Sequence, residues 1–351
     1  MKIKDYCFKT EEFHLHDLPD LLPEDALLLD IETTGFKADY QTIYLIGCGF
    51  RRGEEITVRL FFAETPEEEA EVLCAFLDLL RDFDRLITFN GETFDLPFLE
   101  KRSSKQGLLC TIREKTSTDL FKIAKSHKKW LDLEHYNQKT LEHFFGIFRE
   151  DQYDGGRLIQ VYKQNAAAPD EEAQRLLLLH NMEDVKGMVS LLPITELSML
   201  SRPDFKEMSL DVEKPQEWIF SGTLSRKFNL HLRIKREYFF LQVEEDSYRA
   251  VIRPFVGKMK YFYPDYKNYV YIADENLLLP KSLASAIDKS RIKKATRDIC
   301  FAEKEGCFLP NVLHTDEREF RFACTDKDAY IEVLPGSVTP RFVSEFITAF
   351  V

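Results

Sequence analysis

The sequence predicts an α/β domain over residues 1–200, followed by a smaller α+β domain over residues 201–351. Three strand-like runs follow one another closely early in the chain, and from about 117 to 200 apolar residues recur at helical spacing. The polar, proline-containing stretch LSRPDFKEMSLD (200–211) is the best candidate for a linker or domain boundary. The first domain is therefore expected to be a mixed sheet flanked by helices.

The elements of the first domain can be placed in order. ALLLDIETTG (26–35), TIYLIGCGF (42–50) and EITVRLFFA (55–63) are predicted strands, and their close succession predicts an antiparallel meander. TPEEEAEVLCAFLDLLRDF (65–83) predicts a helix, because Pro66 stands at its start and acids fill its first turn. A further strand (85–90) and a helix that opens at FDLPFLEKR follow.

The second domain has a different pattern. EYFFLQVEEDSYRAVIRPF (237–255) predicts a pair of strands, and KMKYFYPDYKNYVYI (258–272) is dense in aromatic residues and lysine. KSLASAIDKSRIKKATRDICF (281–301) predicts a basic amphipathic helix, and GCFLP and AYIEVL predict short strands near the end. Its role is not indicated by these elements.

Composition limits the class of protein. No window of the 351 residues approaches a membrane span, and MKIKDYCFKTEEF lacks the apolar core of a signal peptide. The seven cysteines are scattered, which indicates reduced thiols and a cytoplasmic protein. The spacing of Cys300, Cys307 and His314 fits no standard zinc site.

The net charge of −12 at first argues against a nucleic-acid partner. Residues 1–200 carry 24 basic and 37 acidic side chains, whereas residues 201–351 carry 24 and 23. The acidic excess therefore belongs to the first domain, where a solvated surface explains most of it.

Several carboxylates stand where they could share a cation. Asp30 and Glu32 alternate at the end of an apolar strand, so their side chains point to one face and repel each other unless a cation lies between them. Asp95 stands at a helix start, where an ordinary N-cap is the simpler explanation. His180 and Asp184, four residues apart in RLLLLHNMEDV, share one side of a helix.

Together these segments resemble the DEDD 3′-5′ exonuclease superfamily, which has a ribonuclease H-like fold. DIETTG resembles its first motif, NGETFDLPFL its second and HNMEDV its third, so Asp30, Glu32, Asp95 and Asp184 correspond to its four acids. TIYLIGCGF, KTLEHFFGI, DGGRLIQVY and LHNMEDV are similar to the bacterial YprB-like branch. The resemblance covers roughly residues 22–195.

The resemblance implies a nuclease that hydrolyses phosphodiester bonds with two metal ions held by these four acids. Hard oxygen ligands suit Mg²⁺ or Mn²⁺. The implied partner is nucleic acid, through single-stranded DNA or RNA ends; protein partners are unknown. The alternatives are a catalytically weak or inactive nucleic-acid-binding protein that keeps the fold, and a structure-specific endonuclease.

One position departs from the family pattern. The superfamily carries a catalytic Tyr four residues before the last acid or a His five before it, whereas here His180 stands at the tyrosine spacing. An imidazole there could act as general base. The metals alone could also position the water.

Basic residues are expected to bind the substrate. Nine cations between 101 and 129 could border the cleft, and the second domain interleaves cations with rings, a pattern of single-strand binders. Packing is the more frequent reason for tyrosine-rich strands. Asp119 could be an extra acid near the site, although a helix cap is the simpler explanation.

Overall fold

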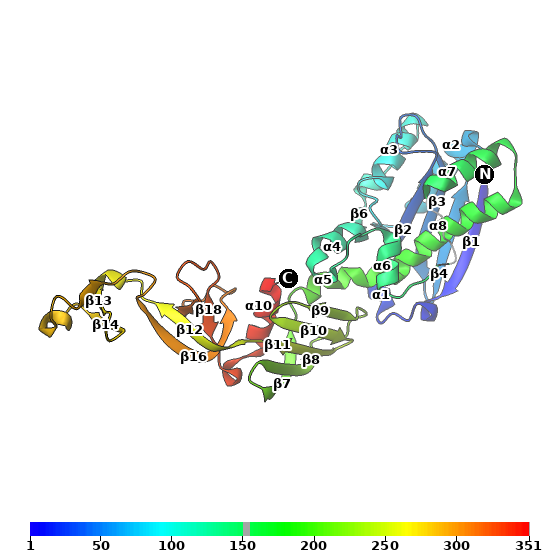
Figure 1. Ribbon diagram of the computed structural model, residues 1–351. Helices are drawn as coiled ribbons and strands as arrows, with labels where there is room; N and C mark the ends of the chain where they lie inside the picture. Colours follow the sequence, from blue (N-terminus) through cyan, green and yellow to red (C-terminus); the bar gives the residue numbers. More distant parts are fainter. Residues whose placement is uncertain (150–154, 351) are drawn as a thin grey trace. The chain divides into compact units, whose positions relative to one another are not determined.

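The computed structural model describes residues 1–149 and 155–350 (Figure 1). The chain divides into two compact units: unit 1 contains Met1–Leu200 with Phe228–Leu230, and unit 2 contains Ser201–Lys227 with His231–Val351. Within the described residues, no helix combines the length and apolar character needed to cross a membrane.

Unit 1 is built on a six-stranded mixed sheet with the strand order β1-β4-β3-β2-β5-β6. The strands are β1 (Lys2–Lys9), β2 (Ala26–Thr33), β3 (Ile43–Arg52), β4 (Glu55–Phe62), β5 (Arg85–Thr88) and β6 (Thr116–Asp119). β1 to β4 pair antiparallel, and β5 and β6 join β2 in parallel. The predicted meander is confirmed, and the edge strand β1 is added to it.

The described helices of unit 1 are α1 (Leu18–Leu21), α2 (Glu69–Leu80), α3 (Asp95–Lys105), α4 (Leu120–Ser126), α5 (Lys128–Leu131), α6 (Gln138–Phe144), α7 (Gly155–Ala167), α8 (Glu171–Leu191) and α9 (Leu197–Leu200). Of these, α2 and α8 pack against the strands of the sheet (Figure 1). Leu27, Leu29 and Ile31 of β2 belong to the core that includes α2 and α3. The alternate residues of β2 therefore face the opposite side, which α8 covers.

Two glycines let α8 approach the sheet closely. A Cβ atom on Gly47 of β3 would overlap the Asn181 side chain of α8, and one on Gly49 would lie 2.7 Å from Val185 Cγ1. Larger residues at these positions would push α8 away from β2 and β3. This close packing sets the distance between the side chains of α8 and those of β2.

Unit 2 is mostly β structure. One sheet contains β7 (Phe205–Lys214), β8 (Glu217–Leu224), β11 (Ser247–Ile252), β10 (Phe239–Glu244) and β9 (Leu232–Lys235). A second contains β12 (Phe255–Phe262), β16 (Phe301–Pro310), β18 (Tyr330–Glu332) and β17 (Glu319–Phe320), and a third contains β14 (Leu277–Pro280), β13 (Tyr269–Ile272) and β15 (Ile292–Lys294). The helix α10 (Pro340–Phe350) completes a small α+β unit.

The division between the two units lies at Leu200 and Ser201, at the start of the stretch expected as a linker or boundary, and its segment 205–211 forms part of β7. The helix expected over 281–301 is absent: this segment contains a 3-10 turn at Ala284–Ala286 and the strand β15, which pairs with β13. The Asp288 carboxylate accepts a hydrogen bond from the Ser290 N–H at 2.9 Å, and such a turn competes with a helix.

Candidate functional site

Asp30 and Glu32 of β2 lie on the face of the sheet that α8 covers. Asp30 Oδ2 accepts a 2.6 Å hydrogen bond from Asn181 Nδ2 of α8. Glu32 Oε2 accepts one from the hydroxyl of Tyr44, a buried residue of β3, at 3.3 Å. Alternation along β2 thus points both carboxylates to one face, as the sequence pattern predicts, and α8 packs on that face.

Asp95 lies at the first position of α3, and its side chain is buried. Its Oδ1 accepts a 3.0 Å hydrogen bond from the backbone N–H of Ile31, the residue between Asp30 and Glu32. The carboxylate therefore ties the start of α3 to β2. A plain N-cap, the simpler expectation, does not describe this contact.

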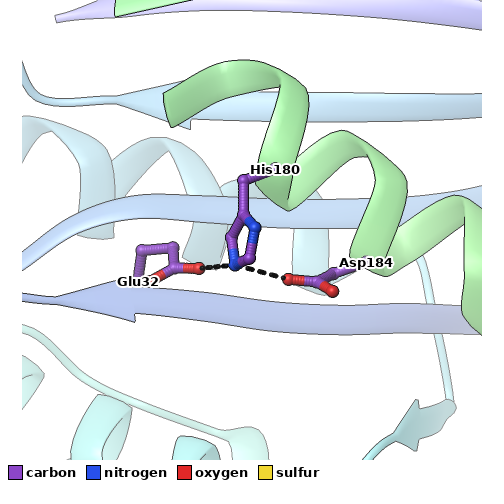
Figure 2. Close-up of side chains that lie close together, drawn as sticks. All are labelled: Glu32, His180 and Asp184. Carbon is purple, nitrogen blue, oxygen red and sulfur yellow. Dashed lines mark ion pairs between the residues drawn. The ribbon is translucent and has the colours of Figure 1, made fainter. Parts of the chain in front are cut away.

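His180 and Asp184 face β2 from α8 (Figure 2). His180 Nε2 lies 3.3 Å from Glu32 Oε1 and 3.2 Å from Asp184 Oδ2. One ligand atom from each of Glu32, His180 and Asp184 lies within 4.8 Å of the other two. Two elements far apart in the sequence thus present a carboxylate–imidazole–carboxylate cluster.

Burial and mutual repulsion disturb the titration of these acids. Burial, with the negative charges of Asp184, Asp95 and Glu32, holds the pKa of Asp30 well above its usual range. Burial also raises the pKa of Glu32 to about 7, against the opposing charge of His180, and raises that of Asp95 to about 7. The charge of Asp184 acts on all three, so the four acids form one electrostatic unit.

The donor set of this cluster fits a divalent metal ion. Glu32 and Asp184 supply hard oxygen atoms, which Mg²⁺ and Mn²⁺ prefer, on either side of His180. Asp30 and Asp95 add two carboxylates whose charges act on the same acids. Buried carboxylates with raised pKa values are the groups that a cation would stabilise. The residues present therefore match the chemistry of such an ion.

The same electrostatics predict how the stability of the metal-free protein depends on pH. The folded-state pKa values of Asp30, Glu32 and Asp95 exceed the unfolded values of about 4. Their contribution to stability is therefore complete below about pH 4 and is lost as the pH rises through about 7. We expect Asp30→Asn to raise the melting temperature of the chelator-treated protein by several degrees at pH 8 and to flatten its decline between pH 4 and 8.

The control for this prediction is Asp5→Asn. Asp5 lies in a surface pair with Arg59, whose hydrogen bond lowers the pKa of that carboxyl, so this change is expected to leave the melting temperature unchanged or lower it. Equal pH profiles for wild type and Asp30→Asn would contradict the charge-cluster interpretation.

Asp119 and Arg102 serve the structure around the site. The Asp119 carboxylate accepts hydrogen bonds from Phe121 N at the start of α4 and from Asn90 N after β5, which confirms the expected helix cap. Arg102, expected among the cations that border the cleft, is instead buried and paired with Glu69 of α2. Both residues fix elements around Asp95.

Other residues that contribute to the site were not predicted from the sequence. Asn181 stands three residues before Asp184 on α8, so helical spacing could have shown that it shares this face. Glu142 of α6 and Arg149 could not have been found, because Arg149 reaches Glu142 and Asp184 through tertiary contacts alone. Local sequence carries no signal for such a contact.

Residues 27–195 match the family model of the RNase_H superfamily. With the six-stranded mixed sheet and its covering helices, this match confirms the predicted ribonuclease H-like fold. A DNA polymerase of Pyrococcus glycovorans is 33% identical over an alignment of 88 residues, which covers 20% of this chain and 11% of that protein. The chain thus matches about a tenth of that relative's length.

The solved structures to which this chain is similar include a DNA polymerase, an exonuclease in complex with an oligonucleotide and a protein bound to pGG. The family B DNA polymerase of Pyrobaculum calidifontis is 15% identical, with 69% of this chain and 35% of that chain covered and a TM-score of 0.40. Escherichia coli exonuclease I with a dT13 oligonucleotide is 11% identical, with 56% and 55% covered and a TM-score of 0.30. Brucella melitensis NrnC bound to pGG is 16% identical, with 52% and 89% covered and a TM-score of 0.28.

Proposed function

We propose that this protein is a metal-dependent nuclease, a 3′-5′ exonuclease of the DEDD type and YprB-like branch, which acts on single-stranded ends of DNA or RNA. The observation that carries the proposal is that buried and half-buried acids from β2, α3 and α8 act on one another, with His180 between Glu32 and Asp184. Proteins rarely bury several carboxylates together for packing alone, because the charges repel one another. A site for cations gives these acids a function.

In the proposed reaction, Asp30, Glu32, Asp95 and Asp184 would hold two Mg²⁺ or Mn²⁺ ions. Such ions, when bound, supply Lewis-acid stabilisation of the leaving oxygen and a more acidic water. The residues supply fixed geometry: Ile31 N–H holds Asp95, and Asn181 holds Asp30. Tyr44 donates a hydrogen bond that holds Glu32.

His180 is the proposed proton acceptor. In this structure its Nε2 lies between two carboxylates, where an N–H is needed to donate to either of them. Once the charges of Glu32 and Asp184 are balanced by cations, the neutral imidazole can keep Nε2 unprotonated. It then accepts the proton of the attacking water.

The test is incubation of 5′-labelled DNA and RNA oligonucleotides with Mn²⁺, comparing wild type with Asp95→Asn. A ladder that shortens from the 3′ end in the wild type alone supports the exonuclease, whereas discrete internal cuts indicate an endonuclease. Cleavage by neither protein, or by both equally, contradicts the proposal. The comparison of DNA with RNA also identifies the substrate.

Unit 2 is proposed to bind the nucleic acid. The rings of Tyr263 and Tyr269 are stacked, with their centroids 4.9 Å apart. Lys260 Nζ lies 4.5 Å from the centroid of the Phe301 ring. We expect neutral substitutions of basic residues in this unit to weaken oligonucleotide binding and to make its salt dependence shallower, because fewer counterions are released. The residues to change are Arg233, Lys235, Arg236, Lys258 and Lys260.

Fluorescence anisotropy at several salt concentrations measures both effects. The matched control is Arg341→Gln on α10, where Arg341 pairs with Glu345. An unchanged affinity and an unchanged salt slope in the multiple variant would assign these residues to packing instead.

A catalytically inactive nucleic-acid-binding protein is the second candidate. The observation in its favour is that His180 and Arg149 already contact Asp184, as they would in a site that no longer takes metal. A thermal shift with Mn²⁺ discriminates between the two. A metal site raises the melting temperature as Mn²⁺ is added, and a decayed site does not.

A further inference from the structure

Arg149 bridges the acid cluster and a second buried carboxylate. Its guanidinium donates through Nε and Nη2 to Glu142 of α6 and through Nη1 to Asp184 Oδ1. The Arg149 side chain is only 7% exposed and that of Glu142 only 1%. The guanidinium is therefore a buried charge shared between an anchor and the candidate site.

Glu142, the anchor of the Arg149 guanidinium, is itself held in place by its surroundings. A Cβ atom on Gly187 of α8 would overlap the Glu142 carboxylate, so the missing side chain of this glycine makes the room that the carboxylate occupies. Gln138 Nε2 donates to Glu142 Oε1 at 2.9 Å and to the Asp184 carbonyl oxygen at 2.7 Å. Two of the three donor nitrogens of Arg149 are thus held independently of the Asp184 carboxylate.

Asp184 has both carboxylate oxygens engaged by nitrogen donors. Arg149 Nη1 donates a hydrogen bond to Oδ1, and His180 Nε2 lies 3.2 Å from Oδ2. A cation that binds Asp184 must displace or share one of these contacts. The positive charge of Arg149 also lowers the pKa of Asp30, against the larger effect of burial, so it acts as a counter-charge for the whole cluster.

We propose that Arg149 is a resident counter-cation which holds Asp184 until a metal ion takes its place, and which then offers the released Nη1 to a phosphate oxygen of the substrate. This inference rests on the proposed function. The guanidinium remains fixed to Glu142 through the exchange, so little ordering is required. Arginine suits the second task because its fork of N–H groups matches the oxygens of a phosphate.

The test uses the double substitution Arg149→Met/Glu142→Gln, which removes both charges with little change in volume. Removing Arg149 alone would leave Glu142 as a buried single charge and would endanger the fold. We expect the double variant to bind Mn²⁺ about tenfold more tightly in calorimetry, because a charge-assisted hydrogen bond no longer competes for Asp184. At saturating Mn²⁺ we expect its kcat/KM on a labelled single-stranded oligonucleotide to fall by roughly 10- to 100-fold.

Arg149→Lys supplies a second comparison. It keeps the charge beside Glu142 but lacks the fork, so its kcat/KM is expected to lie between those of wild type and the double variant. The control is Arg59→Met/Asp5→Asn, which neutralises another bidentate arginine–carboxylate pair, between β4 and β1. This control is expected to leave the Mn²⁺ affinity and kcat/KM unchanged.

Each outcome decides the matter. Tighter Mn²⁺ binding with a lower kcat/KM supports the proposal. An equal or weaker Mn²⁺ affinity in the double variant overturns it and makes Arg149 a purely structural residue, and an unchanged or higher kcat/KM overturns it as well. Absence of Mn²⁺ binding in both wild type and double variant would overturn the proposed metal site itself, a result distinct from equal binding by both.

Discussion

Asp184→Asn is expected to lower the rate of oligonucleotide cleavage by roughly 10³-fold or more, with little loss of fold. Asp184 contributes to the charge of the cluster that acts on Asp30, Glu32 and Asp95, and removing that charge weakens the hold on any cation there. The asparagine keeps the size of the side chain, and Arg149 retains its pair with Glu142. Single-turnover cleavage at high Mn²⁺ measures the rate, and thermal unfolding checks the fold.

The matched control is Glu172→Gln. Glu172 is another acid of the same helix, but its side chain is exposed and pairs with Arg175. We expect this variant to cleave at nearly the wild-type rate. Equal rates for wild type and Asp184→Asn would mean that cleavage, if observed, occurs elsewhere.

His180→Ala is expected to slow cleavage by roughly 10²–10⁴-fold at saturating Mn²⁺, the usual effect of losing a general base. The wild-type rate should fall on the acid side as His180 gains a proton, beyond any loss from weaker metal binding. The decisive measurement is the pH–rate profile of both proteins at saturating metal. The acid limb due to the histidine should be missing from the variant.

His180→Tyr is the informative companion, because tyrosine is the residue that DEDD enzymes carry at this spacing. It is expected to retain more activity than His180→Ala. If the alanine variant keeps both the rate and the acid limb, His180 is not the base, and the histidine serves to neutralise Glu32 and Asp184 instead.

Much of unit 1 could be predicted because its signals are local. The apolar run of β2 is bounded by a turn, and α8 carries its apolar residues at helical spacing. The strand β1 gave a weaker signal, since most of its side chains are exposed on a sheet edge. The helix expected over 281–301 failed because pairing of β15 with β13 outweighs the helical periodicity of that segment.

The same distinction between local periodicity and tertiary packing applies to the residues of the candidate site. Asp30 and Glu32 could be placed on one face by strand alternation, and His180 and Asp184 by the turn of a helix. The meeting of these two pairs, and the bond of Asp95 to Ile31, depend on how the elements pack. Arg149 and Glu142 depend on packing entirely, so no spacing pattern could point to them.

The hydrogen bond between Asn181 and Asp30 joins residues 151 positions apart, so the acid cluster exists only after α8 has docked on β2. Closing so long a loop lowers the entropy of the chain before the contacts between its ends contribute any stabilisation. Such docking is therefore expected late in folding. Divalent ions would then find their ligands only after the folding barrier has been crossed. Mn²⁺ should consequently slow unfolding and leave the refolding rate unchanged in stopped-flow measurements. The metal would lengthen the lifetime of the native state without guiding the chain towards it.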